Sequence, residues 1–419
     1  MLVVWWPALF TFFSQDDFTH LLISRIDDFS DVWKFFIPVK TAIFYRPLSV
    51  QLSTWLFVYI FNLKFFWFHA VALTMHVVNV VLVYKLLSRF VKHYRLAYLG
   101  AFIYGVHPVH FMSLFWMAEF SMVLAPLFAF AAMLAFVDKK HGWFLVWFTL
   151  GLLSNELVIM VPFILMLQRK TRWLIPAFVA AGALMVLRFW LVPVSLGSEY
   201  VMSFSPVTWV INLRWQVMRS MGLPEGFRAY LNWPSIQLAV IFLSGFWAIW
   251  LSSVQIKKRI LLGIGWYVLS LMPVLLLVHH QSPIYQIIGL PGFILVIMLL
   301  GEKAVESRLK FGILAGLFFV GAFWSVRAMN DYHWVTKRAR IARYHIEKLQ
   351  THNPPPNSSI IFLNTVPGSS QEVYMALAGD HAVKALFGNS YQALFEDFNP
   401  GAYPPNAIYI LSRTGNQMQ

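Results

Sequence analysis

The chain has 419 residues, of which 59% are hydrophobic and only 12% are charged, with a net charge of +14. Soluble domains carry about 25% charged residues, so this composition excludes two or three water-soluble domains and indicates an integral membrane protein. The chain has no cysteine, which excludes disulfides, thiolate metal ligands and a cysteine nucleophile. We assign the basic charge to membrane topology and expect no nucleic-acid partner.

Apolar stretches fill the chain up to about residue 329 and predict an all-α polytopic membrane protein. A membrane-spanning helix needs about 20 mainly apolar residues. The first stretch has no basic region before it and no small-residue cleavage site, so we interpret it as a retained span. We predict eleven spans, at 1–14, 65–88, 96–107, 118–137, 143–153, 157–167, 173–194, 236–254, 260–279, 284–300 and 309–328.

Basic residues between the spans predict the orientation. Fourteen of the 32 Lys and Arg lie in five short connections, and eleven spans place all five on one side. The positive-inside rule makes that side the cytoplasm. We therefore expect a multi-pass protein of a bacterial inner (plasma) membrane with a cytoplasmic N-terminus. The clusters are Arg89/Lys92/Arg95, Lys139/Lys140, Arg169/Lys170/Arg172, Lys257/Lys258/Arg259 and Lys303/Arg308/Lys310.

The opposite side receives the larger connecting pieces. The predicted division is a transmembrane domain, 1–329, with extracytoplasmic loops 15–64 and 195–235, and a soluble domain, 330–419. The tail has an amphipathic stretch at 337–349 and a proline-rich breaker at 353–357. Strand-like runs at 359–364 and 407–412 flank a helix-like run at 371–387, which predicts a small α/β extracytoplasmic domain.

Two breaks interrupt the apolar stretches, at 107–110 and at 154–156. Polar, irregular backbone at membrane depth is tolerated where protein or a wet cavity surrounds it. Because one helix over 143–167 would put basic clusters on opposite sides, we predict a hairpin there, with its turn at 154–156. Glu119 and Glu156 both fall at outer-side turns, where acids are costly and therefore candidates for a functional site.

Acidic residues are scarce, and five of the 18 lie in the first outer loop. Asp16 and Asp17 follow the first span directly, where a carboxylate can act as a general base or bind a cationic centre. The alternative is a solvated loop with a helix cap. For Asp27, Asp28 and Asp31 we favour that alternative, the start of a helix.

A few basic side chains on the outer side could bind a phosphate. Arg46 precedes a proline at the outer interface and can bind a phosphate bidentately or act as an interfacial anchor. Arg188, His279 and His280 lie near the outer ends of spans and could bind phosphate or extend toward the interface.

Histidines inside the predicted spans have a different interpretation. His69, His76 and Asn79 share one helical face, which favours hydrogen bonds between helices. His107 and His110 could form a metal-ligand pair, but no third ligand accompanies them. We therefore expect no cofactor and no metal site, although a divalent cation remains open.

The order of these motifs resembles a known family. The acidic pair in Gln15-Asp16-Asp17-Phe18 precedes Tyr45-Arg46-Pro47-Leu48-Ser49, then Gly105-Val106-His107-Pro108-Val109-His110, and then Leu153-Ser154-Asn155-Glu156. Over roughly residues 1–300 the chain resembles membrane-embedded glycosyltransferases of the GT-C fold. It is most similar to protein O-mannosyltransferase relatives that carry tetratricopeptide repeats, and to their bacterial counterparts.

This resemblance implies transfer of a sugar, as in a hexosyltransferase or mannosyltransferase, from a polyprenyl-phosphate donor in the membrane lipid. The acceptor would be a hydroxyl of a protein, lipid or polysaccharide on the outer face. The resemblance implies a catalytic role for Asp16 or Asp17, with Asp16 preferred. Donor-phosphate or substrate binding would involve Arg46, His107, His110, Glu119, Glu156, Arg188, His279 and His280.

Two alternatives remain. Relatives carry an Arg and an acid shortly after Trp116 that this chain lacks, so a non-catalytic relative is one alternative. A transporter or flippase of lipid-linked glycans is the other. Transporters often show matching halves, and we find no such symmetry in the sequence.

Overall fold

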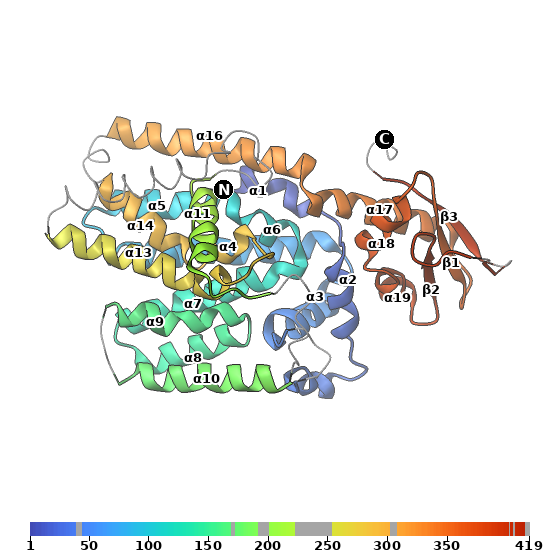
Figure 1. Ribbon diagram of the computed structural model, residues 1–419, viewed down its shortest axis with the longest axis horizontal. Helices are drawn as coiled ribbons and strands as arrows, with labels where there is room; N and C mark the ends of the chain where they lie inside the picture. The colour runs from blue at the N-terminus through green and yellow to red at the C-terminus, as the bar shows by residue number, and fades with distance from the viewer. Residues whose placement is uncertain are drawn as a thin grey trace.

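The structure is a computed structural model that describes residues 1–38, 44–168, 172–191, 201–222, 254–301, 308–401, 403–404 and 407–414. It is mostly helical, with a small parallel sheet at one end (Figure 1). Within the described residues, four helices are long and apolar enough to cross a membrane: Phe65–Leu87, Met117–Val137, Lys257–Leu275 and Phe311–Tyr332. The protein is therefore a membrane protein by the length and composition of its helices, and the larger number of predicted spans is not confirmed.

The expected first span is not one helix. Its residues form a single helical turn, α1 (Leu2–Trp5), followed by a 3-10 helix, η1 (Trp6–Phe10). Pro7 lies in the first turn of η1, where it has no N–H to continue the preceding helix. The chain is extended at Thr11 and enters α2 (Asp16–Ile23) after a sharp turn.

The segment that follows, predicted as an outer loop, is built from short helical pieces. These are η2 (Phe29–Phe36), the π-helical η3 (Pro47–Leu52) and α3 (Ser53–Phe61). The side chain of Asp28 accepts a hydrogen bond from the Ser30 N–H at 3.1 Å and caps η2. The prediction that this acidic stretch begins a helix is therefore confirmed.

The central bundle surrounds α4 (Phe65–Leu87), which packs against α5 (Tyr94–Val106) and α7 (Ser121–Val137). Three polar residues of α4 lie on its buried face, and each bonds to backbone of a neighbouring segment. His69 contacts the Leu114 carbonyl at 2.8 Å, His76 the Gly105 carbonyl at 3.0 Å, and Asn79 the Val123 carbonyl at 2.8 Å. The interpretation as hydrogen bonds between packed segments is confirmed.

Both predicted breaks are present. After α5 the chain forms η4 (Pro108–His110), α6 (Phe111–Phe115) and η5 (Met117–Phe120) before α7 begins. The second break separates α8 (His141–Leu152) from η6 (Glu156–Met160) and α9 (Val161–Met166). Glu119 and Glu156 thus both lie in short 3-10 turns between apolar helices.

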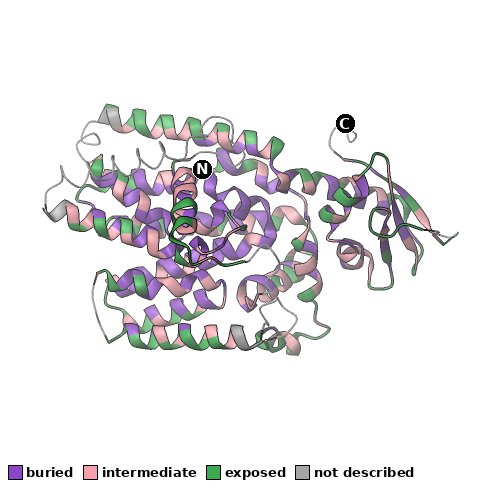
Figure 2. Ribbon diagram, viewed as in Figure 1, coloured by how far each residue is buried: buried purple, intermediate pink, exposed green. Residues whose placement is uncertain are grey.

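The remaining bundle helices are α10 (Leu174–Leu191), α11 (Pro206–Ser220), α13 (Val254–Leu275), η8 (Pro283–Gln286), α14 (Leu290–Leu300) and α16 (Arg308–Tyr332). The helix α11 lies inside the stretch predicted as a loop, 195–235. The predicted span 236–254 falls almost wholly outside the described residues. Burial is concentrated where α4, α5 and α7 meet, and α16 leaves much of its apolar surface exposed, as a lipid-facing helix does (Figure 2).

The tail begins with α17 (Trp334–His352) and continues with β1 (Ser359–Asn364), α18 (Ser369–Leu377), α19 (His381–Phe387), β2 (Gln392–Phe395) and β3 (Ile408–Ser412). The sheet is parallel with order β2-β1-β3, and Phe362 pairs with Phe395 and Ile410. The helix-like run expected at 371–387 is two helices, since Ala378 and Gly379 adopt positive φ between them. The strand β2 was not predicted, and the division into two domains stays a prediction.

The tail lies against the segment that follows the first stretch, as Figure 1 shows for α19 and α2. The Gln15 N–H donates to the Ala376 carbonyl at 2.8 Å, and the Thr19 hydroxyl lies 2.8 Å from His381 Nδ1. Arg25 donates to the Ala385 carbonyl at 2.5 Å. These contacts bring the residues around Asp16 and the tail helices together.

Candidate functional site

Asp17 stabilises the turn that joins η1 to α2. Its two carboxylate oxygens accept hydrogen bonds from the Ser14 N–H at 2.8 Å and the Ala118 N–H at 2.5 Å. The residue is 4% exposed, and this burial raises the pKa of the Asp17 carboxyl well above its usual range, against the pull of the two amides. Both oxygens are already occupied, so Asp17 holds two chain segments together.

Asp16 is the exposed member of the acidic pair. It begins α2, and its charge acts on both Asp17 and Glu119, which places the three carboxyl groups in one electrostatic neighbourhood. Asp17 is buried and bonded to two backbone N–H groups, whereas the side chain of Asp16 is exposed. The two acids therefore have different surroundings, and their roles in a reaction stay a prediction.

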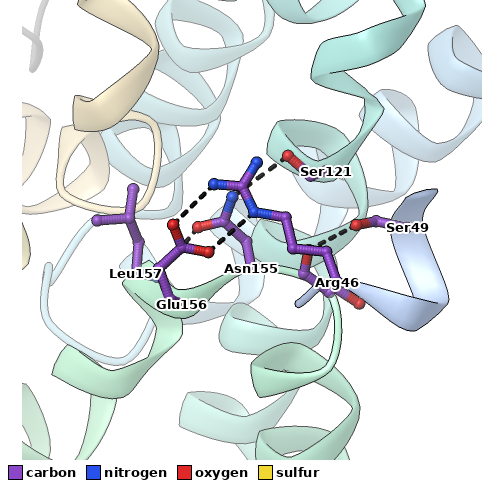
Figure 3. A network of polar contacts seen from close by, with 7 residues as sticks. Arg46, Ser49, Ser121, Asn155, Glu156 and Leu157 are labelled. Carbon is purple, nitrogen blue, oxygen red and sulfur yellow. Dashed lines mark hydrogen bonds and ion pairs between the residues drawn. The ribbon is translucent and has the colours of Figure 1, made fainter. Parts of the chain in front are cut away.

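Arg46 and Glu156 form a two-pronged ion pair (Figure 3). Arg46 Nε donates to Glu156 Oε2 at 2.8 Å, and Nη2 donates to Oε1 at 2.7 Å. Burial opposes the charged form of Arg46, but the charge of Glu156 and the bonds to it raise the Arg46 pKa above its ordinary value. Because Glu156 binds the edge of the guanidinium that carries Nε and Nη2, the opposite edge, which carries Nη1, faces away from Glu156.

Neighbouring polar side chains hold the two segments that carry this pair. Asn155 Oδ1 accepts from the Leu157 N–H at 3.0 Å and caps η6, while Asn155 Nδ2 donates to the Ser121 hydroxyl at 3.2 Å (Figure 3). The Ser49 hydroxyl donates to the Ser154 carbonyl at 2.5 Å. The stretch Ser154-Asn155-Glu156 is thus tied both to η3 and to α7, which fixes where Glu156 points.

Glu119 joins this group from η5. The charges of Arg46, Asp16 and Glu156 all act on it. Its Oε2 is buried and has no hydrogen-bond partner among the described residues. The candidate site, defined as Asp16, Arg46, Glu119 and Glu156, therefore combines three carboxyl groups with one guanidinium.

Three further residues approach this site, two of which sequence reasoning missed. His20 lies one helical turn after Asp16 on α2, and burial together with the charge of Arg46 lowers its pKa to about 4. Tyr285 acts electrostatically on Arg46, and its ring lies 5.7 Å from the ring of His280. The predicted His280 thus lies near a residue that acts electrostatically on Arg46. The helical spacing of His20 from Asp16 was a signal in the sequence that could have identified His20.

A cavity lies directly beside the acidic turn. Asp17, His20 and Thr54 supply its polar lining, and its apolar lining includes Phe57, Phe68 and Phe120 from α3, α4 and η5. The neutral imidazole of His20 therefore faces a partly apolar space next to the candidate site.

The histidines at the first break take part in other contacts. His107 Nε2 contacts the Ser220 carbonyl at 3.1 Å, and its Nδ1 accepts from the Val109 N–H at 3.2 Å. The ring of His110 lies 4.3 Å from that of His76 and 4.6 Å from that of Tyr104. In the part of the chain that the structure describes, neither histidine bonds to a member of the candidate site.

The last predicted residues are less informative. His279 is exposed, and the side chain of Arg188 lies outside the described residues although its backbone belongs to α10. No group of three or more potential metal ligands is found among the described residues.

Comparisons with known proteins add no relative: no family model, no curated protein and no solved structure matches this chain.

Proposed function

We propose that the protein is a membrane glycosyltransferase of GT-C type. It moves a sugar from a polyprenyl-phosphate donor to an acceptor hydroxyl of a protein, lipid or polysaccharide, on the outer face of the membrane. The observation that carries the proposal is the group formed by the exposed Asp16, the carboxyl of Glu119 and the partly buried Arg46–Glu156 pair. The motif order that resembles this family supplies the reaction.

The chemistry needs a base and a group that stabilises the leaving phosphate. Asp16 accepts the proton of the acceptor hydroxyl, whose oxygen attacks the anomeric carbon as the bond between sugar and phosphate breaks. The polyprenyl phosphate departs with the electron pair of that bond. The edge of the Arg46 guanidinium that carries Nη1 stabilises the negative charge of the departing phosphate, and Glu156 fixes the plane of the guanidinium.

The charge of the site limits how the donor can be held. Three carboxyl groups and one guanidinium leave the site net negative when all are ionised. Arg46 is already paired with Glu156, so a phosphate needs further positive charge or neutral donors nearby. We propose His280, whose ring lies 5.7 Å from that of Tyr285, as one source of that charge.

The test is a transfer assay with the purified protein in lipid and a labelled polyprenyl-phosphate sugar. Asp16→Asn should lower turnover by about 10²–10⁴-fold, the usual contribution of a general base, and leave the unfolding transition unchanged. Asp17→Asn should instead destabilise the fold, because an amide nitrogen replaces one of two oxygens that accept backbone N–H groups. Asp31→Asn, on a partly exposed acid paired with Lys34, is the control.

The same assay separates the alternatives. Release of free polyprenyl phosphate supports transfer, and movement of the intact donor across the membrane without bond cleavage would indicate a transporter. Full turnover in Asp16→Asn would show that this carboxylate is not the base.

A further inference from the structure

The residue before the acidic pair has an unusual backbone conformation. Gln15 has φ 53° and ψ −124°, and the Asp17 N–H donates to the Ser14 carbonyl at 3.1 Å. These values match the first central position of a type II′ turn, which glycine favours because a Cβ is strained there. A glutamine at this position stays in place only if the surroundings hold it.

Two contacts from the tail hold Gln15. Its N–H donates to the Ala376 carbonyl at the end of α18, at 2.8 Å. Its side-chain Oε1 accepts from Arg338 Nη1 of α17 at 2.5 Å. The guanidinium of Arg338 in turn lies 5.4 Å from the ring centre of Trp334, which fixes its direction.

A second set of contacts anchors the turn from the bundle side. Trp116 Nε1 donates to the Ser14 carbonyl at 3.1 Å, and the Trp116 ring packs edge-on against Trp334 at 5.1 Å. Ser14 is thus tied to η5 through Trp116 and Asp17, whereas Gln15 is tied to the tail. The peptide that leads into Asp16 lies between these two anchors.

We propose that Gln15 is a positioning residue and that the tail helices hold it in its strained turn so that Asp16 stays close to Glu119 of the candidate site. Relaxation of Gln15 to negative φ reorients the peptide between Ser14 and Gln15, whose N–H bonds to the Ala376 carbonyl, and so redirects the chain that leads into Asp16. The tail is then part of the site. This role in catalysis rests on the proposed glycosyltransferase function, but the holding of the turn does not.

The first test measures the turn itself. Arg338→Gln removes the bond to Gln15, and Lys337→Gln removes an equal charge from the adjacent, exposed position as a matched control. Amide hydrogen exchange of Gln15 and Asp17 should become roughly tenfold faster in Arg338→Gln, the size expected for one lost charge-assisted bond, and stay unchanged in the control. Equal exchange in the two variants would overturn the proposal. If Arg338→Gln does not fold, Arg338→Lys is compared in the same way.

Rescue separates positioning from general loss of structure. Gln15→Gly adopts the turn without strain, so amide protection should survive in this variant, and adding Arg338→Gln should change it little. A full Arg338→Gln effect in the Gln15→Gly background would show that Arg338 acts elsewhere.

The transfer assay then gives the catalytic consequence. Arg338→Gln should lower kcat by roughly tenfold or more, as expected for a misplaced base, with the KM for the donor unchanged. Unaltered kcat together with faster exchange would overturn the role in catalysis. If the native protein transfers no sugar, the proposed function fails, and the exchange results still decide whether the tail holds the turn.

Discussion

The Arg46–Glu156 pair offers a direct measure of how much the candidate site contributes to stability. The two side chains are 11% and 22% exposed, so water screens them little. Glu156→Gln keeps one oxygen acceptor but leaves the guanidinium charge without its counter-charge. A hydrogen bond to a charged group contributes about 1.5–3 kcal/mol, and breaking a fully buried pair costs about 3–5 kcal/mol. With the remaining acceptor and the partial exposure, we expect a loss of about 2 kcal/mol.

The assay is a double-mutant cycle on the free energy of unfolding in detergent micelles. It compares the native chain with Glu156→Gln, Arg46→Met and the double variant, and we expect a coupling energy of about 1.5–2.5 kcal/mol. Glu347→Gln is the control, because Glu347 pairs with Arg343 at 47% and 57% exposure on one helix face, where such pairs contribute about 0–1 kcal/mol. Additive single losses, or a loss in Glu156→Gln no larger than in the control, would refute the reasoning.

Two further predictions concern the bundle and the tail. A Cβ on Gly292 would lie 2.7 Å from the Gly263 carbonyl oxygen, so Gly292→Ala should push α13 away from α14 and lower the free energy of unfolding by about 1–3 kcal/mol. A Cβ on Gly312 meets nothing within 4 Å, so Gly312→Ala should be neutral or stabilising. Unfolding titrations of the two variants test this difference. Burial lowers the pKa of His345 to about 4 in the folded tail, whereas the unfolded chain keeps the ordinary value of about 6.5. Because the unfolded chain binds the proton more readily, the free energy of unfolding of the tail should fall by up to roughly 3 kcal/mol as pH falls from 6.5 to 4. Amide exchange of β3, corrected for the intrinsic pH dependence, should show this loss in the native chain and not in His345→Leu.

Local patterns in the sequence predicted most of the individual elements. The expected span 65–88 is α4, and the expected strand 359–364 is β1. Both breaks between apolar stretches are present, since proline and polar residues at those positions stop a helix locally. The short strand β2 was missed, because four residues are too few to show alternation.

The candidate site was predicted as residues and not as an arrangement. Arg46 and Glu156 were both selected, but their pairing spans 110 positions, and no local pattern specifies it. The roles of Asp16 and Asp17 depend on which one meets the Ala118 N–H, again a distant contact. His20 was not predicted, although it lies one helical turn after Asp16 in the sequence. The contact between the tail and α2 likewise joins residues far apart in the sequence, and no local pattern predicts it.

The join between the last long helix and the tail restricts how the chain length can vary. Only His333 separates α16 from α17, and its side chain caps the second helix by accepting from the Val335 N–H at 3.3 Å. Each residue of a helix advances its direction by about 100°. A single insertion or deletion near the start of α17 would therefore rotate the sheet and its helices out of phase with α2, however mild the inserted residue. At this point the protein should tolerate substitutions far better than changes in length.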